Sequence, residues 1–244
     1  MNVFISQKPV SMKQENLIKN LLVVSLFAIA MGFLEAIVVV YVRELYYPEG
    51  FGFPLKLIPE KIFAIELVRE LTTLVMLVSI GILVGRTRLQ KFAWFLFTFG
   101  IWDIFYYVAL KIFLDWPESL LTWDILFLIP VAWIGPVLAP VIASLTMIGF
   151  ALAVFIPDKP RIRIRPASWI AIVGGALLIF ISFILDYTKL LFKASGTFRF
   201  LEPGFIETIT NYVPNRFYWG LFSLGEIMIL GGITLYVLEK KRIS

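Results

Sequence analysis

The sequence predicts an all-α integral membrane protein, a polytopic bundle of six transmembrane helices with both termini in the cytoplasm. Hydrophobic residues make up 60% of the chain and charged residues 16%, whereas an ordinary soluble domain has about 25% charged residues. Apolar segments of roughly 20 residues, the length of a membrane-crossing helix, recur along the chain. Lysine and arginine gather at alternate ends of these segments, as is typical of cytoplasmic ends.

Five of the predicted spans are simple apolar segments, and one segment is too long for a single crossing. The simple spans cover about 20–43, 62–85, 92–114, 167–189 and 217–238. The long segment, 121–156, contains Pro130, Pro136 and Pro140, and each proline removes a backbone donor that a helix needs. We therefore expect a half-helix or re-entrant segment at about 121–134 and a span at about 137–156.

The loops set the expected orientation of a single membrane domain, residues 1–244. Positive residues dominate the segments that we place in the cytoplasm, which are the tail 1–18, the connection 86–91, the loop 157–166 and the end 240–242. The opposite loops, about 44–61 and 190–216, are longer and aromatic, which suits a membrane–water interface. We therefore expect a multi-pass protein of the cell membrane.

Two missing residue types restrict the chemistry. Cysteine and histidine are both absent, which excludes disulfides, thiolate nucleophiles, histidine-ligated haem or zinc and a Ser-His-Asp triad. No cofactor is predicted, although carboxylates suit a hard divalent cation. The net charge of +5 comes from short loops beside apolar spans, so it does not indicate nucleic acid as a partner.

Acidic residues lie inside four of the predicted spans, at similar depths. They are Glu35, Glu70, Asp103 and Glu226. One charge at the bilayer centre costs at least ~2.5–3.5 kcal/mol, so four isolated charges would cost ~10 kcal/mol or more. We therefore predict that the four carboxylates turn inward and converge on one polar site.

Several neighbours are expected to support this site. Arg69 is the expected positive partner, although Glu66, Arg69 and Glu70 also have the i, i+3, i+4 spacing of an ion network on one helix face. Tyr106 and Tyr107 follow Asp103 by three and four residues on the same helical side. We expect these two tyrosines to hydrogen-bond the Asp103 carboxylate.

Four other residues are expected to have ordinary membrane roles. Trp102 points about 100° away from Asp103, toward lipid or a packing partner. Asp124 is expected in the first turn of a helix, where an acid favours the N-terminal dipole. Arg43 and Lys111 should extend toward the membrane surface.

The carboxylate site predicts a proton- or cation-coupled carrier of a small ion or solute. Excess acid in a low dielectric favours proton or cation uptake, and interrupted helices often frame transporter sites. Two alternatives remain open: an intramembrane enzyme that acts on a lipid or isoprenoid, with Glu35 and Asp103 as acid–base candidates, and a non-catalytic subunit of a larger complex. The expected partners are the lipid bilayer and, through a Gly81-x-x-x-Gly85 face, a second copy in a homodimer.

Overall fold

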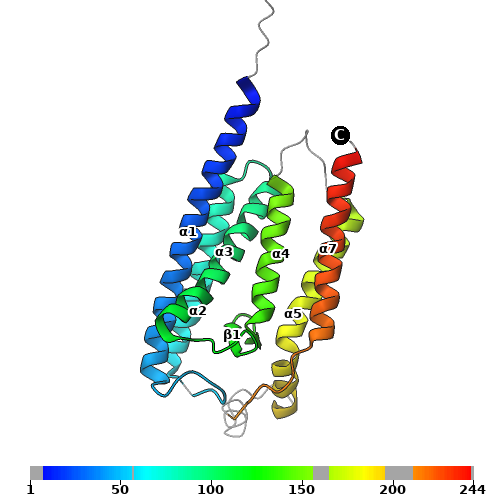
Figure 1. Ribbon diagram of the computed structural model, residues 1–244. Coiled ribbons are helices and arrows are strands. Elements are labelled where there is room, and N and C mark those ends of the chain that lie inside the picture. Colours follow the sequence, from blue (N-terminus) through cyan, green and yellow to red (C-terminus); the bar gives the residue numbers. More distant parts are fainter. Residues whose placement is uncertain (1–7, 57, 156–164, 196–210, 243–244) are drawn as a thin grey trace, which may run out of the picture.

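The protein is a bundle of long helices, seen in a computed structural model that describes residues 8–56, 58–155, 165–195 and 211–242. Within these ranges, six helices are long and apolar enough to cross a membrane, as predicted. They are α1 (Lys8–Tyr46), α2 (Glu60–Val84), α3 (Arg88–Leu114), α4 (Leu138–Phe155), α5 (Pro166–Ser195) and α7 (Trp219–Arg242). The start of α1 and the end of α7 lie at one end of the bundle (Figure 1), here called the terminal end. The opposite end is called the loop end.

The helix boundaries follow local sequence signals. Helix α1 begins at Lys8, inside the segment expected as a tail, because Pro9 is tolerated in a first helical turn. Helix α3 begins after Thr87, whose side chain accepts from the Gln90 backbone N–H in a capping box. It ends at Leu114 and is followed by Asp115, which adopts a left-handed conformation with φ of 51°. The basic loop 157–166 and the outer loop 190–216 lie mostly outside the described residues.

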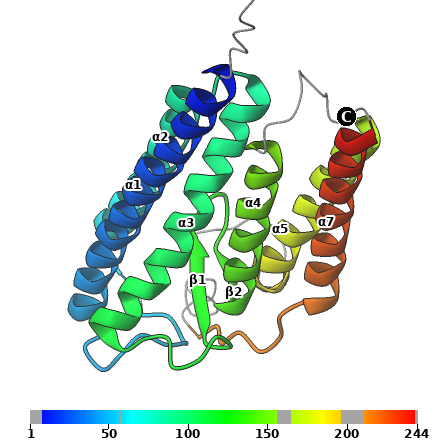
Figure 2. The ribbon, with the colours of Figure 1, turned by 45° about the horizontal axis from the view of Figure 1, so that its top comes forward.

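The segment before α4 is a β-hairpin, so the half-helix predicted as one form of 121–134 is wrong, and the re-entrant alternative stays a prediction. Strand β1 (Trp123–Phe127) pairs antiparallel with β2 (Trp133–Pro136). Both strands are rich in aromatic and β-branched residues, which favour strands, and Pro130 lies in the turn between them. The hairpin enters the bundle beside α3 and α4 and returns to the loop end (Figure 2).

The helices pack in two groups. Helices α1 and α2 both pack on α3, and α3 packs on α4, whereas α5 packs mainly on α7. The α5–α7 crossing is close because Gly175 and Gly225 face each other's backbones, and a Cβ at Gly175 would lie 2.5 Å from the Gly225 carbonyl oxygen. A Cβ at Gly81 would likewise lie 2.5 Å from the Lys91 carbonyl oxygen. The Gly81-x-x-x-Gly85 face therefore packs on α3 of the same chain, which removes the basis for the predicted homodimer.

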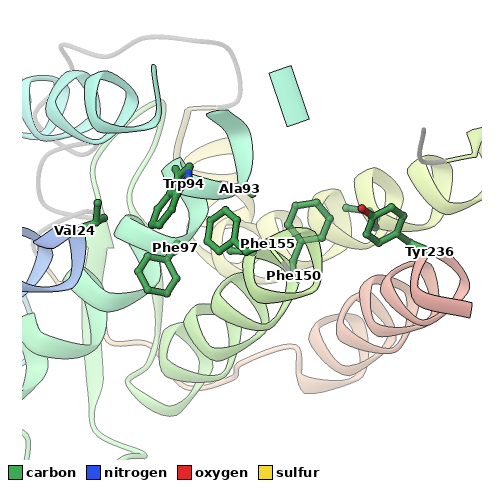
Figure 3. Close-up of a cluster of buried hydrophobic side chains, with 9 residues drawn as sticks. Val24, Ala93, Trp94, Phe97, Phe150, Phe155 and Tyr236 are labelled. Atoms are coloured by element: carbon green, nitrogen blue, oxygen red, sulfur yellow. The ribbon is translucent and has the colours of Figure 1, made fainter. Parts of the chain in front are cut away.

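The largest buried apolar cluster lies toward the terminal end. Trp94 and Phe97 of α3 meet Phe150 and Phe155 of α4 there (Figure 3), with the Trp94 and Phe155 rings 4.2 Å apart. Trp102 is also buried and packs among apolar residues rather than facing lipid. This aromatic packing holds α3 and α4 together at one end and leaves the polar side chains to the loop half of the bundle.

Candidate functional site

A cavity of about 670 Å³ lies in the loop half of the bundle. Side chains from α1, α2, α3, the hairpin, the 47–59 loop and the end of α5 line it. Three of the four predicted acids are among them, namely Glu35, Glu70 and Asp103. The other predicted site residues, Arg69, Tyr106 and Tyr107, also line the cavity. Glu226 is absent from its walls.

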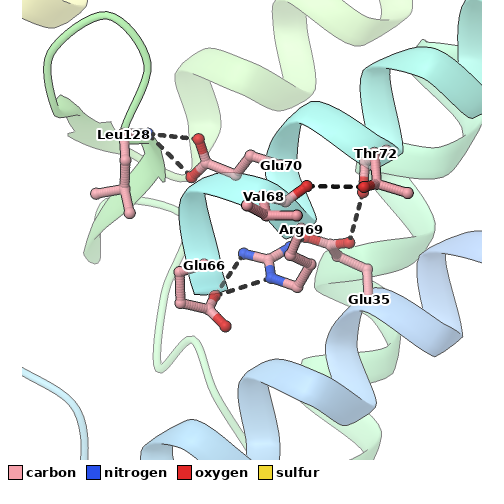
Figure 4. Close-up of polar contacts among 8 residues, drawn as sticks. Glu35, Glu66, Val68, Arg69, Glu70, Thr72 and Leu128 are labelled. Carbon is pink, nitrogen blue, oxygen red and sulfur yellow. Dashed lines mark hydrogen bonds and ion pairs between the residues drawn. The ribbon is translucent and has the colours of Figure 1, made fainter. Parts of the chain in front are cut away.

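Arg69 pairs with two carboxylates, one on α1 and one on its own helix α2 (Figure 4). Its guanidinium forms an ion pair with Glu35 of α1. It also donates from Nε and Nη2 to one oxygen of Glu66, at 2.8 Å each. The Thr73 hydroxyl donates to the second Glu35 oxygen at 3.2 Å. We call Glu35, Glu66, Arg69 and Thr73 the Arg69 cluster; it is both a helix-face network and a link between two helices.

Glu70 holds the tip of the hairpin. The Leu128 backbone N–H donates to both Glu70 carboxylate oxygens, at 2.9 and 3.0 Å. The Trp133 indole closes the same turn by donating to the Ile129 carbonyl at 2.9 Å. Glu70 lies ten residues into α2, about 15 Å from its start. At that depth a backbone N–H needs a protein partner because lipid offers none, so Glu70 caps the hairpin turn, which is partly exposed.

Asp103 is held from α4, and the predicted bonds from Tyr106 and Tyr107 are absent. The Ser144 hydroxyl donates to Asp103 Oδ2 at 2.8 Å. The Tyr107 hydroxyl instead reaches Asp124 on β1, at 3.2 Å. A tyrosine hydroxyl extends well beyond a short aspartate on the same helix face, so it meets the facing element. Spacing along one helix could not reveal this difference in reach.

Asp124 and Arg43 form a second charged group that sequence reasoning assigned to ordinary roles. Asp124 is 1% exposed and lies on β1 rather than in a helix. It accepts from Arg43 Nη2 at 3.2 Å. The Arg43 guanidinium lies over the rings of Phe51 and Trp116, at 4.2 and 3.9 Å from the centroids. We call these four residues with Tyr107 the Arg43 cluster. Arg43 is buried and does not extend to the surface.

The remaining charged residues behave differently from one another. Lys111 is exposed, as predicted, and pairs with exposed Asp115 at 2.7 Å. Glu226 accepts from Thr146 of α4 at 2.7 Å. The structure does not bring it to the cavity with the other acids, because α7 packs mainly on α5 and also on α4.

The cavity also contains residues that the sequence analysis did not include in the site. Glu66 and Asp124 add two acids to its walls, and Arg43 adds a second arginine. Glu66 could have been included from the sequence, because its i, i+3 spacing to Arg69 predicts an ion pair on one helix face. Asp124 and Ser144 carried no such signal, since their partners lie on other elements. No group of three or more acids among the described residues is arranged to hold a metal ion, and the divalent cation stays a prediction.

These features define a class: a multi-pass helical membrane protein with a charged cavity between three helices and a β-hairpin. The membrane assignment rests on the six long apolar helices, and the cavity is called charged because several acidic and basic side chains line it. Comparison with known proteins adds no closer relation, since no family model, no curated protein and no solved structure matches the chain.

Proposed function

We propose that the protein is a proton-coupled carrier, which binds a small solute in the cavity and exchanges a proton with its carboxylates. The observation that carries the proposal is the imbalance of charge. Six acids line the cavity together with three basic residues, Arg43, Lys56 and Arg69; the acids are Glu35, Glu60, Glu66, Glu70, Asp103 and Asp124. Surplus carboxylates in a low dielectric need a proton or a cation as counter-charge.

Asp103 is the proposed proton-exchanging group. Glu35 and Glu66 share Arg69, and Asp124 pairs with Arg43. Asp103 has a hydroxyl partner, Ser144, in place of an arginine. Its side chain is 8% exposed, and it lines the cavity. A carboxylate without a fixed positive partner is the group whose charge changes most readily when a solute enters or leaves.

The proposed orientation places both termini in the cytoplasm and the cavity toward the outer side. The positive residues near the terminal end support this orientation. Reporter fusions after Arg88 and after Arg163 should read cytoplasmic, and fusions within 50–56 should read external. A cytoplasmic reading within 50–56 would overturn the orientation.

Proton coupling is tested in liposomes that hold the purified full chain and a pH-sensitive dye. Amino acids, sugars, organic acids and organic cations are added one at a time, and the lumenal pH is followed. We expect at least one solute to drive a pH change that is lost in Asp103→Asn. Glu226→Gln is the matched control, because it removes a buried carboxylate outside the cavity. Equal fluxes in wild type and Asp103→Asn would overturn the proposal.

An intramembrane enzyme that acts on a lipid is the second candidate. The apolar walls of the cavity favour it, since Leu55, Phe63, Phe127 and Leu191 all contribute. Glu35 and Asp103 would be its acid and base. Mass spectrometry of liposome lipids incubated with the protein would detect turnover. A new lipid product that disappears in Asp103→Asn would favour the enzyme over the carrier.

A further inference from the structure

We infer that the cavity binds a lipophilic organic cation and that this cation competes with a proton for Asp103. The inference rests on the proposed function and names the class of solute that the same cavity takes. Two features carry it: the chemistry of the walls, and an acid that has no arginine partner.

The walls combine acids with aromatic and aliphatic side chains. Tyr106, Phe127 and Phe51 line the cavity together with Val39 and Leu55. Its volume of about 670 Å³ lies within the roughly 300–1,000 Å³ of sites for drug-sized ligands. A bare proton or metal ion needs neither that volume nor apolar walls. An organic cation uses both, since its apolar body packs on the walls and its charge is attracted to aromatic faces.

The charge of the cavity selects a cation over an anion. The charged side chains that line the cavity with Asp103 are Glu35 and Arg43 from α1, Lys56 from the 47–59 loop, Glu60, Glu66, Arg69 and Glu70 from α2, and Asp124 from β1. Both arginines are already paired with carboxylates, and Lys56 is exposed. Six acids against three basic residues repel an anion, which would meet only the exposed Lys56 outside these pairs, whereas a cation meets Asp103 directly.

The preference of the cavity for a cation is tested by measuring how two probes bind to the purified full chain in detergent. Tetraphenylphosphonium and tetraphenylborate have the same shape and opposite charge, and equilibrium dialysis measures both. We expect tetraphenylphosphonium to bind at least roughly tenfold more tightly, and its Kd to rise roughly tenfold per pH unit in the acidic range where one proton competes. Asp103→Asn should weaken it roughly tenfold or more, and Glu226→Gln should leave it unchanged.

Failure of this inference differs from failure of the proposed function. If tetraphenylphosphonium does not bind, or if tetraphenylborate binds as well as tetraphenylphosphonium, the ligand class is wrong. The carrier proposal would still stand if another solute drives a proton flux that depends on Asp103. Loss of both the binding and the flux would overturn the two together.

Discussion

The two buried arginines of this protein sit in contrasting surroundings. Arg43 and Asp124 have side chains that are 7% and 1% exposed, and two aromatic rings cover the guanidinium. Arg69 is 20% exposed, and its partners Glu35 and Glu66 are 13% and 11% exposed. The first cluster pairs one positive with one negative charge, and the second pairs one positive with two negative charges. We interpret the Arg43 cluster as structural and the Arg69 cluster as part of the solute site.

The largest expected effect on stability comes from Arg43→Ala. It leaves Asp124 buried without a counter-charge, and breaking one partner of a buried pair costs about 3–5 kcal/mol. Thermal unfolding in detergent should show the loss. Lys111→Ala is the matched control, because it breaks an exposed ion pair and should change the melting temperature little. Equal shifts in the two variants would erase the distinction between buried and exposed pairs.

Arg69→Ala should destabilise less than Arg43→Ala. It strands Glu35 and Glu66, but both line the cavity, where protons can neutralise them. The stability of the variant should therefore recover in acidic buffer, since protonation removes the uncompensated charge. A second substitution, Glu66→Gln, should restore part of it at neutral pH by removing one stranded carboxylate. Melting curves at two pH values measure both effects. A loss of thermal stability that does not depend on pH would mean that protons cannot reach Glu35 and Glu66, and that the Arg69 cluster is as inaccessible as the Arg43 cluster.

Glu70→Ala should cost about 1–3 kcal/mol, the usual penalty for leaving one buried donor unsatisfied. The donor is the Leu128 N–H, so amide hydrogen exchange at the hairpin tip should rise by more than exchange in α4. Glu70→Gln keeps one acceptor oxygen and should be milder. Unchanged exchange at Leu128 in the alanine variant would contradict the capping role.

Asp103→Asn should have the smallest effect on stability, within about 1 kcal/mol. The amide oxygen can still accept from Ser144, and a neutral amide is cheaper to bury than a carboxylate. The melting temperature should therefore stay close to wild type while proton coupling is lost. A large fall in melting temperature would make Asp103 a structural residue like Asp124 and would weaken the contrast between the two clusters.

Much of this architecture was accessible from the sequence, because lipid imposes strong rules on length and charge. The six helices follow from apolar segments long enough to cross a bilayer. The cost of a buried charge placed Glu35, Glu70 and Asp103 on inward faces, and all three line one cavity. Arg69 was expected as their partner because it follows Glu66 by three residues and lies beside Glu70.

The errors concern contacts between elements that are distant in sequence. Segment 123–127 is apolar enough to be part of a transmembrane helix. It forms a strand because it pairs with 133–136, and Glu70 holds the turn between the two strands. Asp124 looked like a helix cap because the hairpin was not predicted. Glu226 was assigned to the shared site from its depth alone, but depth does not determine which neighbour a helix packs on. Its partner is Thr146 of α4.

The hairpin tip has a consequence for the order in which the chain assembles during synthesis. The Leu128 N–H finds its acceptor on α2, which leaves the ribosome before the hairpin does. A tip that reached the bilayer core ahead of α2 would have no acceptor for that group. Helices α1 to α3 must therefore be in place when the hairpin enters. A Glu70 variant should accordingly be retained on the insertion machinery or degraded during biogenesis, even where the mature protein tolerates the change.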